Sequence, residues 1–280
     1  MRIIIALFFI LALNNCSKQR ENLLGNDIRL FEKSPVRELA KAVEREDTLE
    51  IKSIAKDNKI QIDYQEPKFG KTLLMLAVKN GSYPSTKVLV ESGADPNLQD
   101  KYDGTSALMD ACNYGTNWET DPAILKLLLK NGGDPNATQQ GPRPEGNFTR
   151  VTPLIIAAGC CLEKVKLLVE AGANVNYISE FNESALESAF HGGQDKGDIV
   201  LYLLIDKNAD FKKSFGNTIN GNEIRITNLL RNWLFPLDSE EYKKKMRIVD
   251  FLRERGEDYW ASPVPKKYFK NYPKEYLEKY

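Results

Sequence analysis

Histidine is almost absent from this chain, since His191 is the only one among 280 residues. A single histidine excludes most histidine-based metal sites, and it excludes a Ser-His-Asp triad anywhere else in the chain. The chain also lacks a charge of one prevailing sign, because Lys plus Arg and Asp plus Glu both number 39. Without a global field, nothing in the composition favours nucleic acid or another polyanion as a partner.

Long hydrophobic runs are missing as well. The apolar segment Ile3–Leu13 has eleven residues and follows the positive charge of Arg2. A helix that spans a bilayer needs about 20 apolar residues, so this segment is too short for a stable transmembrane anchor. A short apolar run behind a positive charge is typical of the hydrophobic part of an export signal.

Cys16 follows this apolar segment closely. Its surroundings resemble a bacterial lipobox, in which the cysteine is acylated and becomes the mature N-terminus. Leu13 matches the family pattern, whereas Asn14 and Asn15 depart from the small residues usually found there. The resemblance implies a lipid anchor at Cys16, and Ser17 implies the outer membrane, facing the periplasm. A plain secretory signal, cleaved without lipidation, is the alternative.

A six-residue motif recurs four times, each time with a hydroxyl residue first and alanine last. The copies are Thr72–Ala77, Ser106–Ala111, Thr152–Ala157 and Ser184–Ala189. The hydroxyl predicts the N-cap of a short helix, and Pro153 is compatible with a first helical turn. Four copies in one chain predict a repeat protein.

A second helix and a stop signal follow each copy of the motif. The apolar segments 87–90, 124–129, 165–169 and 199–204 have helical spacing. The stops are Gly93–Asn97, Gly132–Asn136, Gly172–Asn176 and Asn208–Phe211. Glycine suits the left-handed residue that ends a helix, and we expect Asn208 to take the same role as the glycines.

These motifs resemble the ankyrin repeat, which comprises the hexad T-P-L-H-x-A, an inner helix, an outer helix, the turn G-A-D-x-N and a β-hairpin finger. The resemblance covers residues 36–260 and implies an all-α solenoid of about six units, of which two are degenerate caps. The family's histidine is replaced by Met75, Met109, Ile155 and Glu187. We therefore expect packing, in place of hydrogen bonds, to join the repeats at the first three positions.

The predicted organisation has four parts. Residues 1–15 are the lipoprotein signal peptide, 16–35 a linker, 36–260 the repeat domain, and 261–280 a C-terminal tail rich in lysine and aromatic residues. Two insertions, at 114–121 and 138–150, lengthen the interval between the second and third hexads, and insertions in solenoids often emerge on the binding face. The tail either covers the last repeat or contacts a membrane surface.

Aromatic and charged side chains are interleaved in the predicted fingers, a composition favoured at protein interfaces. By the family resemblance, the finger tips and the exposed side of the inner helices form a concave surface that binds another protein. The predicted partner-binding residues are Tyr64, Phe69, Lys79, Lys101, Tyr102, Asp110, Asn113, Trp118, Phe148, Tyr177, Phe181 and Glu187. We expect a non-catalytic module tethered at the bacterial envelope, in an immunity-type, inhibitory or scaffold role, as a monomer or 1:1 complex.

An enzymatic or redox function is the alternative, with Cys160, Cys161 or His191 as its reactive group. The two cysteines are adjacent and lack the C-x-x-C spacing, so burial in the core is the simpler interpretation. His191 falls at a predicted helix C-terminus, where its ring typically meets the terminal carbonyls. Glycine pairs without a βαβ context and D-x-N turns without EF-hand spacing predict no cofactor and no metal.

Overall fold

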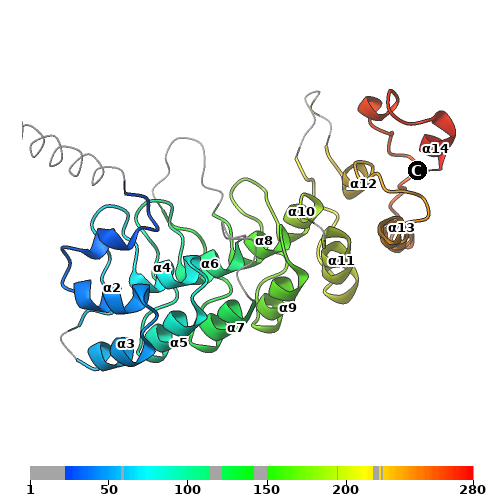
Figure 1. Ribbon diagram of the computed structural model, residues 1–280. Coiled ribbons are helices and arrows are strands. Elements are labelled where there is room, and N and C mark those ends of the chain that lie inside the picture. Colours follow the sequence, from blue (N-terminus) through cyan, green and yellow to red (C-terminus); the bar gives the residue numbers. More distant parts are fainter. Residues whose placement is uncertain are drawn as a thin grey trace, which may run out of the picture.

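Two rows of short helices stack along the molecule (Figure 1). This computed structural model describes residues 23–57, 60–113, 122–141, 150–193, 195–216, 221 and 223–279. The inner row contains α4 (Leu73–Lys79), α6 (Ala107–Cys112), α8 (Pro153–Ala158) and α10 (Ala185–Phe190). The outer row contains α5 (Tyr83–Glu91), α7 (Pro122–Lys130), α9 (Leu162–Glu170) and α11 (Lys196–Leu201), which continues into the π-helical turn η2 (Tyr202–Asp206). Each inner helix packs against the next, as the solenoid prediction requires.

Degenerate units close both ends of the stack. At the N-terminal end lie η1 (Ile28–Phe31), α2 (Arg37–Glu44) and α3 (Thr48–Ala55). At the C-terminal end lie α12 (Ile226–Leu230), α13 (Glu240–Arg253), η3 (Lys266–Tyr268) and α14 (Lys274–Glu278). Both end units are helical, as the resemblance implies for degenerate caps, and α13 packs on α11.

The hydroxyl residues of the hexads cap the inner helices as predicted. Thr72 accepts a hydrogen bond from the backbone N–H of Met75 at 3.2 Å, and Ser106 accepts one from Met109 at 3.2 Å. The two later hexads make the same bond through Thr152 and Ser184. Each cap satisfies a backbone donor that has no partner within the helix, which is why the inner helices begin where they do.

The helix stops also have the predicted conformation. Gly93 has φ +97°, and Asn208 has φ +51°, in the left-handed region that ends a helix. Asparagine side chains then link one turn to the next: Asn97 Oδ1 accepts from the backbone N–H of Asp134 at 2.7 Å, and Asn136 Oδ1 accepts from that of Asn174 at 2.8 Å. This ladder fixes the spacing of the repeats along one edge of the stack.

Apolar packing joins the inner helices where the family has histidine. Met75, Met109 and Ile155 are all buried, so the expectation of packing at these positions is confirmed. Glu187 at the fourth position is half-buried and lies 3.7 Å from Lys213 Nζ. The hydrophobic core is continuous from Phe31 through the repeats to the C-terminal cap.

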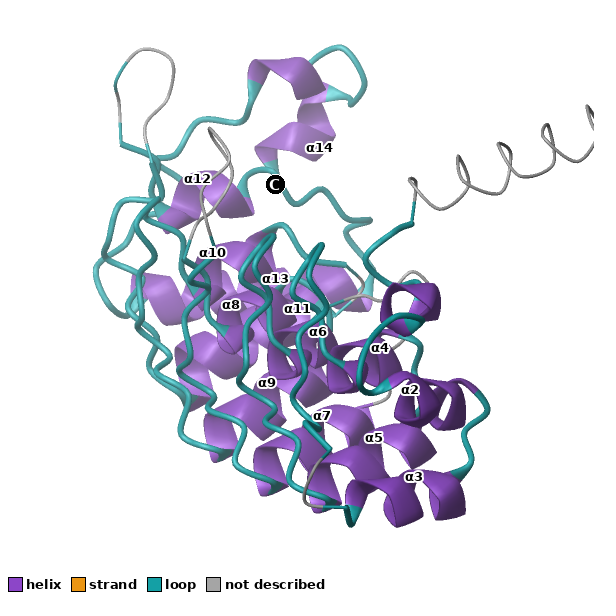
Figure 2. Cartoon of the chain, turned by 90° about the vertical axis from the view of Figure 1, so that its left-hand side faces the viewer, coloured by secondary structure: helices purple, strands orange, loops and turns teal. Residues whose placement is uncertain are grey.

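The segments that connect outer helices to the next inner helices rise from the stack as fingers (Figure 2). Within the described residues the fold is helical with no named strand, and Gln99 and Ser106 form an isolated antiparallel bridge. The all-α fold is therefore confirmed, while the described parts of the fingers are turns and loops without a β-ladder. Side chains add to scattered backbone bonds in holding them: Gln99 donates to Thr138 O at 2.8 Å, and its Oε1 accepts from Gln140 N at 2.7 Å.

The C-terminal tail packs against the last repeat. Leu277 is buried, and the hydroxyl of Tyr276 donates to Phe235 O at 2.6 Å. The hydroxyl of Tyr268 donates to Asn232 O at 3.2 Å. The tail thus covers the end of the stack, which was one of the two expectations from its composition.

In the described part of the chain, no helix is both long and apolar enough to cross a bilayer. Three predicted functional residues lie outside that part, namely Cys16, Trp118 and Phe148.

Candidate functional site

The fingers and the adjoining side of the inner helices together form one surface, which we call the finger face. The fingers comprise residues 60–71, 95–105, 134–151, 174–183 and 210–225, as far as these are described. In Figure 1 they lie above the inner row, on the side away from the outer helices. All the predicted partner-binding residues that the structure describes belong to this surface or border it.

Buried carboxylates hold the first two fingers in shape. Glu66 is inaccessible to solvent and accepts backbone N–H groups of Lys68 and Phe69, both at 2.7 Å. Asp100 has the same role in the second finger, where it accepts those of Tyr102 at 2.8 Å and Asp103 at 2.9 Å. A carboxylate that accepts several backbone donors rigidifies a loop, so the tips of these fingers are preorganised.

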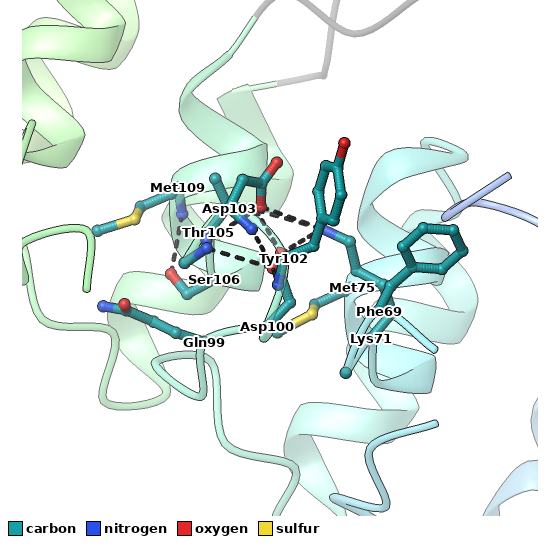
Figure 3. Close-up of polar contacts among 12 residues, drawn as sticks. Phe69, Lys71, Met75, Gln99, Asp100, Tyr102, Asp103, Thr105, Ser106 and Met109 are labelled. Atoms are coloured by element: carbon teal, nitrogen blue, oxygen red, sulfur yellow. Dashed lines mark hydrogen bonds and ion pairs between the residues drawn. The ribbon is translucent and has the colours of Figure 1, made fainter. Parts of the chain in front are cut away.

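A buried ion pair links the two fingers. Lys71 from the first finger contacts the carboxylate of Asp100 in the second, and Thr105 Oγ1 donates to the same carboxylate at 2.8 Å (Figure 3). Burial raises the pKa of Asp100, but its contacts with Asp103 and Lys71 outweigh that effect and lower the pKa. Burial lowers the pKa of Lys71, but the charges of Asp110 and Asp100 raise it by more. The pair therefore stays charged at neutral pH.

The aromatic residues of the fingers divide into packed and exposed groups. Tyr64 packs edge-on against Phe31, and the hydroxyl of Tyr177 donates to Arg150 O at 3.0 Å. Tyr102 and Phe181 are 60% and 58% exposed. Phe181 and Tyr102 are thus the aromatic residues that the described fingers present to solvent.

Phe69 supports Tyr102 from the neighbouring finger. Their ring centroids lie 5.7 Å apart in an edge-to-face arrangement, and Lys68 Nζ lies 4.8 Å from the centre of the Phe69 ring (Figure 3 shows the two rings). The backbone N–H of Lys101 donates to Phe69 O at 2.8 Å. Ring and backbone contacts restrict the Tyr102 side chain, which lowers the entropy it would lose in an interface.

The remaining predicted residues surround the inner helices. Lys79, Lys101 and Asn113 are exposed, whereas Asp110 on α6 is half-buried, with its Oδ2 atom buried. Burial raises the pKa of Asp110 to about 6, against the opposing charges of Lys71 and Lys79. Its Oδ2 has no hydrogen-bond partner among the described residues. An ionisable group of this kind is uncommon, because buried carboxylates usually have donors.

Glu187 on α10, one position earlier in its hexad than Asp110, has a cation beside it. Lys213 in the fifth finger lies 3.7 Å from Glu187 Oε2, and its Nζ also donates to Asn182 O at 2.8 Å. Burial raises the pKa of Glu187, and burial lowers that of Lys213. The two groups neutralise each other between the fourth and fifth fingers.

The described N-terminal segment crosses the first finger. Lys68 Nζ donates to Leu23 O at 2.9 Å, and Gly25 lies against the Phe69 and Lys71 side chains. Phe31 at the end of η1 is buried against the first units. The chain's own N-terminal segment thus covers part of this end of the stack.

Two features argue against the enzymatic alternative. His191 Nδ1 lies 3.0 Å from Glu187 O at the end of α10, which is the helix-terminal role expected for it. Cys112 and Cys160 are buried, and burial raises the pKa of the Cys160 thiol to about 11, so little thiolate forms at neutral pH. Cys161 is partly exposed and is the N-cap residue of α9. The described residues contain no group of three potential metal ligands.

Sequence reasoning missed three residues that build the site: Glu66, Lys71 and Lys213. Each interacts with the backbone or a side chain of a finger. Each also lies outside the repeated motifs, so the repeat pattern does not single it out. A charged residue next to a hexad, as Lys71 is next to Thr72, is a weak signal of such a contact. Its partner Asp100 lies 29 positions away, which no local pattern identifies.

Comparison with protein families finds a match to the model "Ankyrin repeats (3 copies)" over residues 39–139 and 117–214. Among solved structures, the crystal structure of EF0377, an ankyrin repeat protein, has 26% sequence identity and a TM-score of 0.53. The likeness covers 78% of this chain and 98% of that one.

Curated relatives resemble the chain over its repeats. Neurogenic locus notch homolog protein 1 of Xenopus laevis is 34% identical over 132 residues, 46% of this chain and 5% of that protein. The putative ankyrin repeat protein L86 of Acanthamoeba polyphaga mimivirus is 29% identical over 166 residues, 52% of this chain and 28% of that protein. The chain thus matches less than a third of the length of either relative.

Proposed function

Because the chain belongs to the ankyrin-repeat family, we propose that it captures another protein on its finger face and catalyses no reaction itself. Ankyrin repeats are protein-binding modules, and their stacked loops offer an extended contact surface. The observation that carries the proposal is the exposure of Phe181 and of Tyr102, the latter on a finger that Asp100 preorganises. Exposed, restrained aromatic side chains are the usual energetic centres of protein interfaces.

Charge and shape are consistent with a protein partner. The formal net charge of zero favours neither nucleic acid nor an acidic surface. Mixed charges surround the aromatic residues, including Lys101 and the pair of Arg150 and Glu180, whose Nε and Oε1 lie 3.3 Å apart. An aromatic centre with a polar rim is the common composition of reversible protein interfaces.

The test is partner capture by matched variants of the full chain. The double variant Tyr102→Ala, Phe181→Ala should retain little of whatever the wild-type chain captures from an extract of its source cells. Tyr83→Ala is the control, since Tyr83 is 39% exposed at the start of the outer helix α5. A loss of at least about tenfold in affinity for the double variant alone supports the finger face. Equal capture by all three proteins contradicts it.

We further propose that the chain is exported and lipid-anchored through Cys16, facing the periplasm from the outer membrane. The apolar run Ile3–Leu13 and the lipobox-like position of Cys16 support this proposal. A protein-binding module anchored there would inhibit, protect or hold an envelope protein, as an immunity protein or scaffold does. Incorporation of labelled palmitate that Cys16→Ser abolishes is the expected result. Incorporation of labelled palmitate into the Cys16→Ser variant would contradict lipidation at Cys16.

A further inference from the structure

Asp110 lies at a position of the finger face that is apolar in both neighbouring inner helices. In the hexad register its position is that of Leu76 in α4 and Ile156 in α8. Leu76 is buried and Ile156 is half-buried, because each packs against the adjacent inner helices of the stack. A carboxylate at this position is desolvated by the same packing, and its Oδ2 accepts no hydrogen bond within the described part of the chain. The fold described here therefore supplies this oxygen with no donor.

The charges around Asp110 do not balance. Lys71 from the first finger and Lys79 from α4 act on it as cations, and Asp100 and Asp103 from the second finger act as anions. Cys112 on its own helix is a further titratable neighbour, but its thiol is buried and burial raises its pKa. Lys71 contacts Asp100 directly and lies 3.8 Å from Asp103 Oδ1, so its charge is already shared. With three carboxylates and two lysines, the cluster carries one excess negative charge when all are ionised.

We propose that this cluster, defined as Lys71, Lys79, Asp100, Asp103 and Asp110, receives an arginine side chain of the captured partner, whose guanidinium donates to Asp110. The inference rests on the proposed function, because the arginine belongs to a protein bound on the finger face. The guanidinium balances the excess charge and supplies the donor that Asp110 lacks. Arginine fits better than lysine, since its planar group is weakly hydrated and keeps its charge when buried.

The exposed ring of Tyr102 adds to the fit. Tyr102 belongs to the same finger as Asp100 and Asp103, and its side chain lies beside the Lys71 ion pair in Figure 3. Guanidinium groups stack on aromatic faces while they bond to carboxylates. The exposed ring of Tyr102 is therefore available to an arginine that binds at this cluster.

The test is the titration of the Asp110 carboxyl carbon by NMR in the full chain, with Nα-acetyl-arginine amide as the probe. Nα-acetyl-citrulline amide has nearly the same shape without the charge and is the matched ligand control. The arginine probe should move the Asp110 midpoint from about 6 to lower pH, because it binds the ionised carboxylate more tightly than the protonated acid. The citrulline probe should leave the midpoint in place.

Two variants complete the experiment. Asp110→Asn should abolish the saturable amide shifts that the arginine probe causes around α6. Glu187→Gln should retain them, since Glu187 already has Lys213 beside it. An Asp110 midpoint that neither probe moves, or that both move equally, overturns the arginine assignment. Partner capture by the Tyr102 and Phe181 variants is a separate measurement, so the finger face and its arginine site can fail independently.

Discussion

The side-chain oxygen of Asn97 accepts a hydrogen bond at 2.7 Å from the backbone N–H of Asp134, which is 37 positions away and begins the next turn. The amide nitrogen of Asn97 donates to Gly132 O at 2.8 Å. One side chain thus satisfies a donor and an acceptor of the following repeat. The same arrangement recurs at Asn136, so the turns are bonded to one another along the edge of the stack.

Asn97→Ala should destabilise the stack by about 1–3 kcal/mol, because it leaves an amide and a carbonyl of the next repeat without their partners. The measurement is the free energy of unfolding in urea. Asn80→Ala is the control, since Asn80 is exposed at the end of α4 and alanine suits its backbone φ of −83°. Equal effects of the two substitutions would show that the ladder contributes nothing specific.

Lys71→Met should lower the free energy of unfolding by about 3–5 kcal/mol, because it leaves Asp100 ionised and buried without its cation. The side chains of Lys71 and Asp100 are only 6% and 0% exposed. Lys41→Met breaks an exposed pair with Glu38 and should cost no more than about 1 kcal/mol. A small effect at Lys71 would mean that the ion pair does not hold the two fingers together.

Asp110→Asn should stabilise the chain at neutral pH, and the difference should depend on pH. The pKa of Asp110 is raised to about 6 by burial, from 3.8. The folded state therefore holds the proton more tightly, and wild-type stability falls as pH rises from about 4 through 6. Asparagine does not titrate, so the advantage of the variant should grow over that interval by about 3 kcal/mol. A pH-independent difference in the free energy of unfolding would contradict the burial of this charge.

Lys245→Met should also stabilise the chain, but with the opposite dependence on pH. Lys245 is buried beside Tyr259 and donates to Trp233 O at 3.2 Å. Burial, followed by the charge of Arg231, lowers the pKa of Lys245 to about 6 from 10.5. The unfolded state then binds more protons, so wild-type stability falls as pH decreases from about 10 towards 6. Urea unfolding should favour the variant by about 1–3 kcal/mol at pH 7 and by little near pH 10.

The buried thiols should be unreactive in the folded chain. In a Cys16→Ser, Cys161→Ser variant, only Cys112 and Cys160 remain. Both are buried, and burial raises both pKa values, so a thiol reagent should modify neither until the chain unfolds. Modification in the native state at the rate of the unfolded chain would revive a redox function for these cysteines.

Much of the fold was predictable because its signals are local. A hydroxyl residue caps a helix within one turn, and glycine or asparagine ends a helix at its own φ, so Thr72 and Asn208 indicate structure without knowledge of their neighbours. Repetition strengthens the prediction of a helical repeat fold, since the same signals return in each of the four clear units.

The candidate site was only partly predictable. Sequence and family resemblance placed Tyr102, Phe181 and Asp110 on one surface, but composition could not separate exposed aromatic residues from packed ones such as Tyr64. Exposure depends on how each finger lies against the next. The pairing of Glu187 with Lys213 depends on it too, because the two residues belong to different units.

The sequence by itself determined that this chain stacks helix pairs, where the inner helices of the four repeats begin and the outer helices end, and that His191 meets a helix terminus. These properties depend on interactions within a few residues, so the order of the amino acids is sufficient. Only the tertiary structure decided that Lys71 meets Asp100 between two fingers, and that Asp110 Oδ2 is buried with no donor among the described residues. Such contacts depend on distances between repeats, which packing and side-chain hydrogen bonds set together.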